Sequence, residues 1–151
     1  MSARAMGMGE AFLGVANDAS VLYYNPAALS LLTQKEAIFT HIEYPAEINY
    51  EFVGLTVPTP SFGGTFGVSF YMLGMDDMAV TGYNTRSGTI GNTGQTFTAK
   101  DYALGLSYGA GLTDRFSLGL TLKYVAQYIE EESAKGWAAD LGTYYDTGFR
   151  N

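Results

Sequence analysis

From residue 36 onward, apolar and polar side chains alternate with a period of two, which predicts a succession of β-strands. The two most regular strands, Thr96–Leu112 and Phe116–Ile129, are separated only by Thr113–Arg115, which predicts an antiparallel hairpin with a compact turn. Less regular strands are predicted at Ala37–Tyr44, Glu47–Val57, Phe62–Leu73 and Gly136–Asp146.

Two polar stretches interrupt the alternation. Gly74–Gln95 is long and dotted with glycine, so it is predicted to be a loop with one short strand at Met78–Thr81. Glu130–Lys135 is predicted to be a charged loop. The turns at Pro58–Ser61 and Thr113–Arg115 are short and alternate with the long one, which is typical of outer-membrane barrels.

Residues 1–35 do not alternate, and they hold the only predicted helices. Glycine is frequent within Ala3–Gly14, which favours irregular chain or a short helical turn. Helices are predicted at Ala19–Tyr23 and Ala27–Leu32. Asn25 is the expected N-cap of the second helix, and Pro26 suits its first position.

The two faces of the predicted strands differ in a way that favours a membrane barrel. In the strand that contains Asp101–Leu112, one face carries large apolar side chains and the other carries mostly small ones. Twelve residues at about 3.3 Å each span about 40 Å, and a tilt of about 45° projects this to the thickness of a hydrocarbon core. A soluble β-sandwich or lipocalin-like barrel explains the alternation equally well, but it does not explain the small second face.

Composition narrows the choice of function. The 151 residues are 47% hydrophobic and only 15% charged, with 19 Gly and 12 Tyr, a balance common in strand-rich chains. The net charge of −7 disfavours nucleic acid as a partner. The chain has no cysteine, so it forms neither disulfides nor thiolate metal sites. No apolar run is long enough for a transmembrane helix, and no secretory signal opens the sequence.

Several blocks together suggest a family. Ala3–Gly9 (ARAMGMG), Ala16–Ala19 (ANDA) and Tyr24–Ala27 (YNPA) lie near the start, and Leu112–Tyr124 and Trp137–Tyr145 have the pattern of barrel strands. This combination resembles the PorV/PorQ branch of the FadL-like outer-membrane β-barrel proteins. The resemblance covers most of the chain, and its first block is the most specific part.

The resemblance implies that the opening segment is a hatch inside a barrel. It places Asn25, Pro26 and Ala27 in the hatch motif, and Gly7 and Gly9 are its glycines. The implied fold class is all-β with a short N-terminal helical hatch, an antiparallel meander that forms part of an up-and-down transmembrane barrel. Six strands cannot close around a plug, and open edges cannot face lipid. We therefore expect the chain to be the front part of a longer protein.

The expected organisation is a hatch over residues 1–35 and barrel strands over residues 36–151. The implied location is the cell outer membrane, with its lipid as one partner. PorV-like members act in type IX-like protein secretion and surface delivery, so a secreted protein is one expected cargo. The alternatives are FadL-like uptake of long-chain fatty acids or other hydrophobic compounds, and a soluble β-rich binding module.

Candidate site residues follow from the face that points away from lipid. Asp101, Lys123 and Asp140 fall on it by alternation, so they are predicted to be polar groups of the lumen or anchors of the hatch. The small residues of this face are predicted to receive the hatch: Ala103, Gly105, Ser107, Gly109 and Gly119.

No enzymatic activity, catalytic residue, metal or cofactor is expected. Gly105–Gly109 matches the G-x-S-x-G motif of esterases, but that chemistry needs a strand-to-helix turn and a histidine later in the chain. The motif lies inside a predicted strand, and the only histidine, His41, precedes it. His41 shares a face with Glu43, so we expect a hydrogen-bonded pair in the barrel wall.

Overall fold

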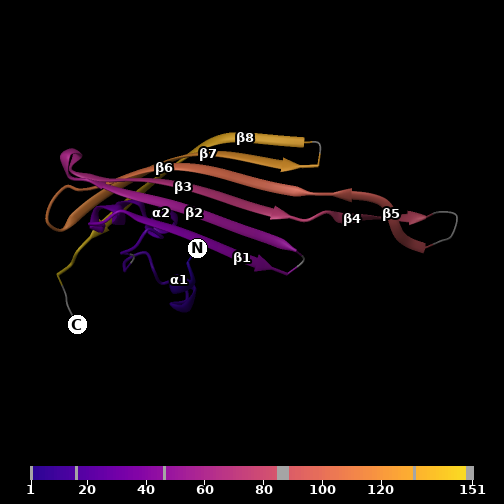
Figure 1. The fold of residues 1–151 in the computed structure, drawn as a ribbon, viewed down its shortest axis with the longest axis horizontal. Helices are drawn as coiled ribbons and strands as arrows, with labels where there is room; N and C mark the ends of the chain where they lie inside the picture. Colours follow the sequence, from indigo (N-terminus) through magenta and orange to yellow (C-terminus); the bar gives the residue numbers. More distant parts are fainter. Residues whose placement is uncertain (1, 16, 46, 85–88, 131, 149–151) are drawn as a thin grey trace.

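The chain folds as one curved antiparallel sheet with a short helical segment on one side (Figure 1). The computed structural model describes residues 2–15, 17–45, 47–84, 89–130 and 132–148. The six-stranded sheet has the order β1-β2-β3-β6-β7-β8, and β4 and β5 form a separate two-stranded ribbon. In chain order the elements are α1 (Ala3–Gly7), α2 (Val21–Tyr24), η1 (Pro26–Leu31), β1 (Glu36–Tyr44), β2 (Ile48–Thr59), η2 (Pro60–Phe62), β3 (Gly64–Met75), β4 (Met78–Asn84), β5 (Thr89–Phe97), β6 (Ala99–Gly111), β7 (Phe116–Ile129) and β8 (Glu132–Tyr145).

The prediction of an all-β chain with a few short helices is confirmed. Each strand of the large sheet pairs antiparallel with its neighbours. β1 and β8 are the two edges, and the sheet is open over the described ranges. None of the described helices is long and apolar enough to cross a membrane. Two parts of the sequence predictions lie outside the described residues. They are Ala16, which belongs to the Ala16–Ala19 block of the family resemblance, and residues 149–151 at the end of the predicted barrel strands.

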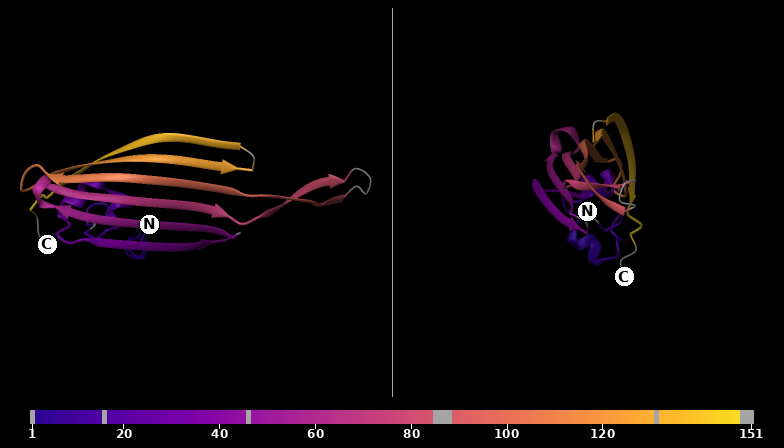
Figure 2. Two further views of the ribbon diagram at one scale, coloured as in Figure 1. Left: turned by 45° about the horizontal axis from the view of Figure 1, so that its top comes forward. Right: turned by 90° about the vertical axis from the view of Figure 1, so that its right-hand side faces the viewer.

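The region predicted as a long loop is a β-hairpin, so that prediction is wrong for most of Gly74–Gln95. The predicted short strand at Met78–Thr81 lies within β4, and β5 pairs with β4 from Met78 opposite Phe97 to Asn84 opposite Thr89. Since β3 and β6 are neighbours in the sheet, β4 and β5 continue them as a ribbon that projects beyond the other strands (Figure 2). Pairing between the two arms supplies the backbone hydrogen bonds, despite the many glycines.

The predicted charged loop at Glu130–Lys135 is also mostly wrong. β8 begins at Glu132, and Lys135 lies opposite Ala126 of β7. Glu132 and Lys135 are therefore strand residues, Glu130 follows the end of β7, and Glu131 lies outside the described residues. The prediction failed because charged residues also occur in strands when their side chains reach water.

The N-terminal segment, which we define as residues 2–35, begins with a short helix. The Ser2 hydroxyl caps α1 by accepting a hydrogen bond from the Ala5 amide at 3.2 Å. α2 and η1 fall where the sequence predicts helices, although η1 is a 3₁₀-helix. Asn25 caps η1, and Pro26 occupies its first position, as predicted.

The two faces of the sheet are unlike each other. The inner face, which the N-terminal segment covers, buries hydroxyls such as those of Thr56, Ser107 and Thr121. The outer face, on the opposite side, is apolar and exposed; Leu106, for example, is 57% exposed. Three adjacent rows of cross-strand neighbours on the outer face are entirely apolar: Val57, Phe66, Tyr108, Leu120 and Leu141; Ala37, Leu55, Val68, Leu106, Leu122 and Ala139; and Phe39, Val53, Phe70, Leu104, Tyr124 and Trp137.

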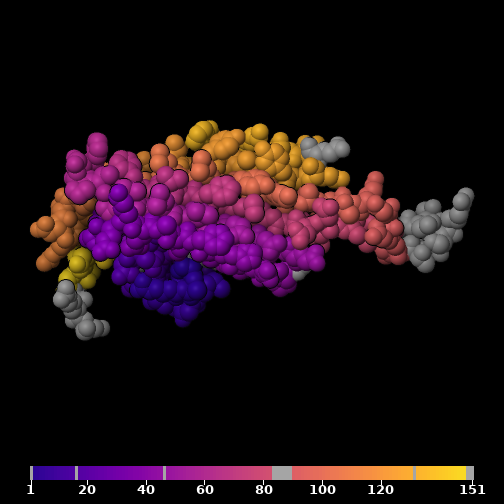
Figure 3. Space-filling model, viewed as in Figure 1, coloured from indigo at the N-terminus to yellow at the C-terminus, as the bar shows by residue number. Residues whose placement is uncertain are grey.

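The hydrophobic core lies between the N-terminal segment and the inner face. Phe12, Val21, Leu22 and Leu29 are buried there against Phe52 of β2. The space-filling view shows the segment as a compact mass beneath β1 and β2 (Figure 3), and the end-on view shows the sheet curving around it (Figure 2). The segment therefore supplies most of the apolar atoms of the core, and the sheet supplies the wall.

Candidate functional site

The N-terminal segment rests on a track of glycines that crosses the inner face. Gly119 of β7 has no side chain, and a Cβ there would lie only 2.2 Å from the carbonyl carbon of Pro26. At Gly67 a Cβ would lie 2.3 Å from Leu22 Cδ2. Such distances are far below van der Waals contact, so the segment approaches this closely only because the side chains are absent. One glycine comes from each of five adjacent strands: Gly54, Gly67, Gly109, Gly119 and Gly142.

This track overlaps only partly with the predicted docking face. Gly109 and Gly119 contact the N-terminal segment, whereas the nearest atoms around Gly105 belong to Ser69, Thr121 and Lys123. Gly54, Gly67 and Gly142 were not among the predicted residues. In β2, β3 and β8 these glycines alternate with the apolar residues of the outer face, so the alternation of the sequence already places them on the inner face.

The predicted hatch motif lies at the centre of this contact. The Asn25 side chain accepts a hydrogen bond from the Ala27 amide and donates one to the Thr143 carbonyl of β8, both at 3.1 Å. Pro26 and Ala27 are buried against Gly119. Asn25 thus caps η1 and ties it to the edge strand with a single side chain.

Gly7 and Gly9 lie away from the sheet contact. A Cβ at either glycine would meet nothing within 4 Å. Gly9 has a φ of 61°, which explains why glycine suits that position, and Gly7 ends α1. Arg4 of α1 links this helix to the residues before α2, since its Nη1 lies 2.6 Å from Asn17 Oδ1 and 3.2 Å from Asp18 Oδ2.

The structure brings two of the three predicted inner-face charges together. Lys123 Nζ lies 2.5 Å from Asp140 Oδ2, and the two side chains are 24% and 45% exposed. Asp101 is also on the inner face, but it lies opposite Leu73 and Gln127, nearer the far ends of the strands. It is therefore not part of the Lys123–Asp140 pair.

A groove of about 870 Å³ opens between the N-terminal segment and strands β7 and β8. Lys123 and Asp140 lie in its wall, beside the apolar side chains of Leu13 and Leu22. Tyr23 also lines it, and burial raises the pKa of the Tyr23 phenol above its ordinary value. The groove therefore combines a mainly polar lining with a few apolar side chains, tyrosines and one ion pair.

Sequence reasoning missed two residues that position the N-terminal segment. Tyr71 of β3 donates a hydrogen bond from its hydroxyl to the Leu22 carbonyl at 3.1 Å. Glu36 accepts one from the Ala19 amide at 2.8 Å. In β3, Tyr71 alternates with the apolar residues of the outer face, and this placement on the inner face is the one sequence signal for its role.

The esterase-like motif has no catalytic geometry. Ser107 is 1% exposed, lies in the middle of β6, and its hydroxyl is 2.8 Å from that of Thr121. His41 is on the outer face, with Nδ1 2.5 Å from Glu51 Oε1 and Nε2 3.5 Å from Glu43 Oε1. Over the described ranges, no three His, Asp or Glu residues are arranged to hold a metal ion.

The comparison with protein families gives one match. The model of an uncharacterised protein family, UPF0164, matches residues 2–142. The chain belongs to this family. The matched range contains the N-terminal segment, the glycine track and both residues of the Lys123–Asp140 pair. No curated protein and no solved structure matches the chain.

Proposed function

We propose that the chain forms part of the wall of an outer-membrane β-barrel, with its outer face against lipid and its N-terminal segment inside the lumen. The observation that carries this proposal is the inverted polarity of the sheet. Leucine, valine and phenylalanine are exposed on the outer face, while serine and threonine hydroxyls are buried on the inner face. A continuous exposed apolar surface of this size is typical of contact with a membrane or another protein.

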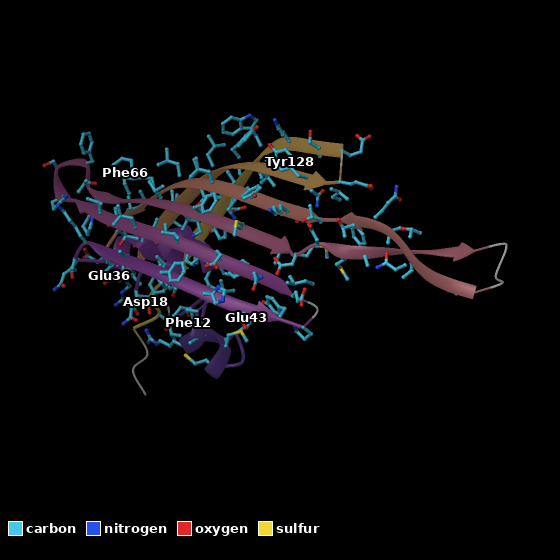
Figure 4. All side chains as sticks on the ribbon, turned by 45° about the vertical axis from the view of Figure 1, so that its right-hand side comes forward. Phe12, Asp18, Glu36, Glu43, Phe66 and Tyr128 are labelled. Carbon is cyan, nitrogen blue, oxygen red and sulfur yellow. The ribbon has the colours of Figure 1, made fainter. Side chains whose placement is uncertain are left out.

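The ends of the apolar surface carry aromatic side chains, which supports lipid over protein as the contact. At one end Phe66 packs on Tyr108, with ring centroids 4.8 Å apart. At the other end Tyr102 meets Tyr128 at 6.1 Å. Figure 4 shows Phe66 and Tyr128 toward opposite ends of the sheet, on the side away from Phe12. Two aromatic girdles around an apolar band are typical of transmembrane barrels.

Charged residues begin where the apolar rows end. The next row toward the β1–β2 turn contains the bonded pair His41 and Glu51, and it ends at Lys135 on β8. The Lys135 ammonium lies 5.8 Å above the Tyr128 ring. Polar groups at the margin of an apolar band reach the lipid headgroups and water, so this row marks one border of the membrane.

The activity that the groove favours is passage of a hydrophobic small molecule. Its volume of about 870 Å³ is within the range of sites for small ligands, about 300–1,000 Å³. Most of the exposed lining is polar, but Leu13 offers an apolar contact for an alkyl chain, and Lys123 suits an acidic end group. Uptake of long-chain fatty acids or similar compounds is therefore the first candidate.

Protein secretion of the type IX kind is the second candidate, and the β4–β5 ribbon favours it. The ribbon projects beyond the large sheet and exposes Ile90, which is 76% exposed. An exposed ribbon offers a surface for a polypeptide cargo rather than for a small molecule.

A pair of glycine variants tests the first candidate. Gly14 lines the groove, Gly7 does not, and a Cβ at either position would meet nothing within 4 Å. We expect Gly14→Trp to slow accumulation of radiolabelled oleate by cells that express the protein, and Gly7→Trp to leave it unchanged. Equal uptake by both variants and by cells lacking the protein contradicts the uptake function. Loss of surface-delivered protein on removal of residues 78–97 would instead support secretion.

A further inference from the structure

The Lys123 side chain crosses the neighbouring strand β6 and lies near Tyr71, which is hydrogen-bonded to the N-terminal segment. It is on β7, yet its Nζ lies 5.7 Å from the centre of the Tyr71 ring on β3. The intervening residue opposite Lys123 on β6 is Gly105, and a Cβ there would lie 3.7 Å from Lys123 Cγ. Lys123 therefore passes over Gly105 at ordinary van der Waals distance.

Tyr71 in turn holds α2. Its hydroxyl donates to the Leu22 carbonyl at 3.1 Å, and its ring lies 5.0 Å from Phe52 and 6.0 Å from Tyr23. A cation above the ring of a tyrosine attracts it through the ring quadrupole. Lys123 therefore helps to fix the ring that carries the hydrogen bond to α2.

The other partner of Lys123 faces the groove. Asp140 Oδ2 lies 2.5 Å from Lys123 Nζ, and both side chains line the groove next to the N-terminal segment. A single ammonium is thus shared between a carboxylate at the groove wall and an aromatic ring that holds α2.

We propose that Lys123 is a positioning residue that couples charge in the groove to the position of α2. An amphiphilic anion in the groove competes with Asp140 for the Lys123 ammonium and draws it away from Tyr71. The Tyr71 ring is then less constrained, its bond to the Leu22 carbonyl weakens, and α2 opens more often. This inference rests on the groove being the ligand site of the proposed function.

Thiol labelling tests the coupling, because the chain has no cysteine of its own. Ser20, the residue before α2, is 0% exposed, so Ser20→Cys reacts only when α2 opens. In this background Lys123→Gln is expected to raise the labelling rate about threefold to thirtyfold, the range that loss of a cation–π contact produces. Lys123→Arg, which keeps the cation, is expected to restore most of the protection.

A double variant separates coupling from a general loss of structure. If Lys123 acts through the Tyr71 hydroxyl, Lys123→Gln combined with Tyr71→Phe labels no faster than the faster single variant. Decyl sulfate is expected to speed labelling of the Ser20→Cys protein and to have no effect in the Lys123→Gln background. Decyltrimethylammonium has the same alkyl chain and the opposite charge, so it is expected to leave the rate unchanged.

Additive effects of the two substitutions, equal effects of the two amphiphiles, or failure of Lys123→Arg to protect would each overturn the inference. The labelling is measured on purified protein and does not depend on transport. If uptake is normal but decyl sulfate does not change the labelling rate, only the coupling is refuted. If decyl sulfate changes the labelling rate but the cells take up no oleate, only the transport function is refuted.

Discussion

Placing a charge at the centre of the outer face distinguishes a lipid-facing sheet from a soluble one. Leu106 lies in the second of the three apolar rows, between Val68 and Leu122, and it is 57% exposed. On a soluble protein, Leu106→Lys would be a surface substitution that changes the free energy of unfolding by about 0.5 kcal/mol or less. At the middle of a bilayer, a lysine on the lipid face costs about 2–4 kcal/mol. The same substitution therefore has two well-separated expected outcomes.

The control is a charge on the same face at the border of the membrane. Met72 lies directly opposite Glu51, in the row where charged residues begin. Met72→Lys is expected to cost about 1 kcal/mol or less, since the penalty falls toward the interface. Both variants are made in the complete barrel and refolded into phospholipid vesicles, and their unfolding free energies are measured with urea at an unchanged m-value. A Leu106→Lys protein as stable as the Met72→Lys protein would refute the lipid-facing assignment.

Three further predictions concern the contact between the N-terminal segment and the sheet. Gly119→Ala is expected to destabilise the fold by about 1–3 kcal/mol through overpacking, while Gly136→Ala, where a Cβ meets nothing within 4 Å, changes little; urea unfolding measures both. Asn25→Ala removes the cap of η1 and the bond to β8, and it is expected to cost about 0.5–2 kcal/mol and to speed hydrogen exchange in η1, whereas undiminished protection there would contradict the role of the cap. Thr121→Val leaves the buried Ser107 hydroxyl without its partner, at a cost of about 1–3 kcal/mol; adding Ser107→Ala is expected to recover part of this loss, and strictly additive losses would argue against the pair.

The strands were predictable because the sheet has two chemically distinct faces. Every second residue is apolar from Tyr102 to Ala110 in β6 and from Phe116 to Tyr128 in β7, and this pattern alone fixes which residues share a face. The cap and first position of η1 were predictable for a similar reason, since Asn25 and Pro26 act on their immediate neighbours.

The parts that the sequence did not reveal depend on contacts between distant residues. The β4–β5 ribbon forms because its two arms pair with each other, and Gly82, Gly91 and Gly94 interrupt the strand pattern of the arms. The hydrogen bond from Tyr71 to Leu22 spans 49 positions, and that from Asn25 to Thr143 spans 118. Alternation places each side chain on a face, but it does not say which distant segment will lie against it.

The most direct test of the central claim uses the single tryptophan. Trp137 lies on the outer face of β8 and is 72% exposed. If the outer face contacts lipid, phospholipids brominated along their acyl chains will quench its fluorescence in vesicles, its emission will be blue-shifted, and aqueous iodide will quench it weakly. Emission at the wavelength of free tryptophan, with full quenching by iodide and none by brominated lipid, would contradict the membrane assignment.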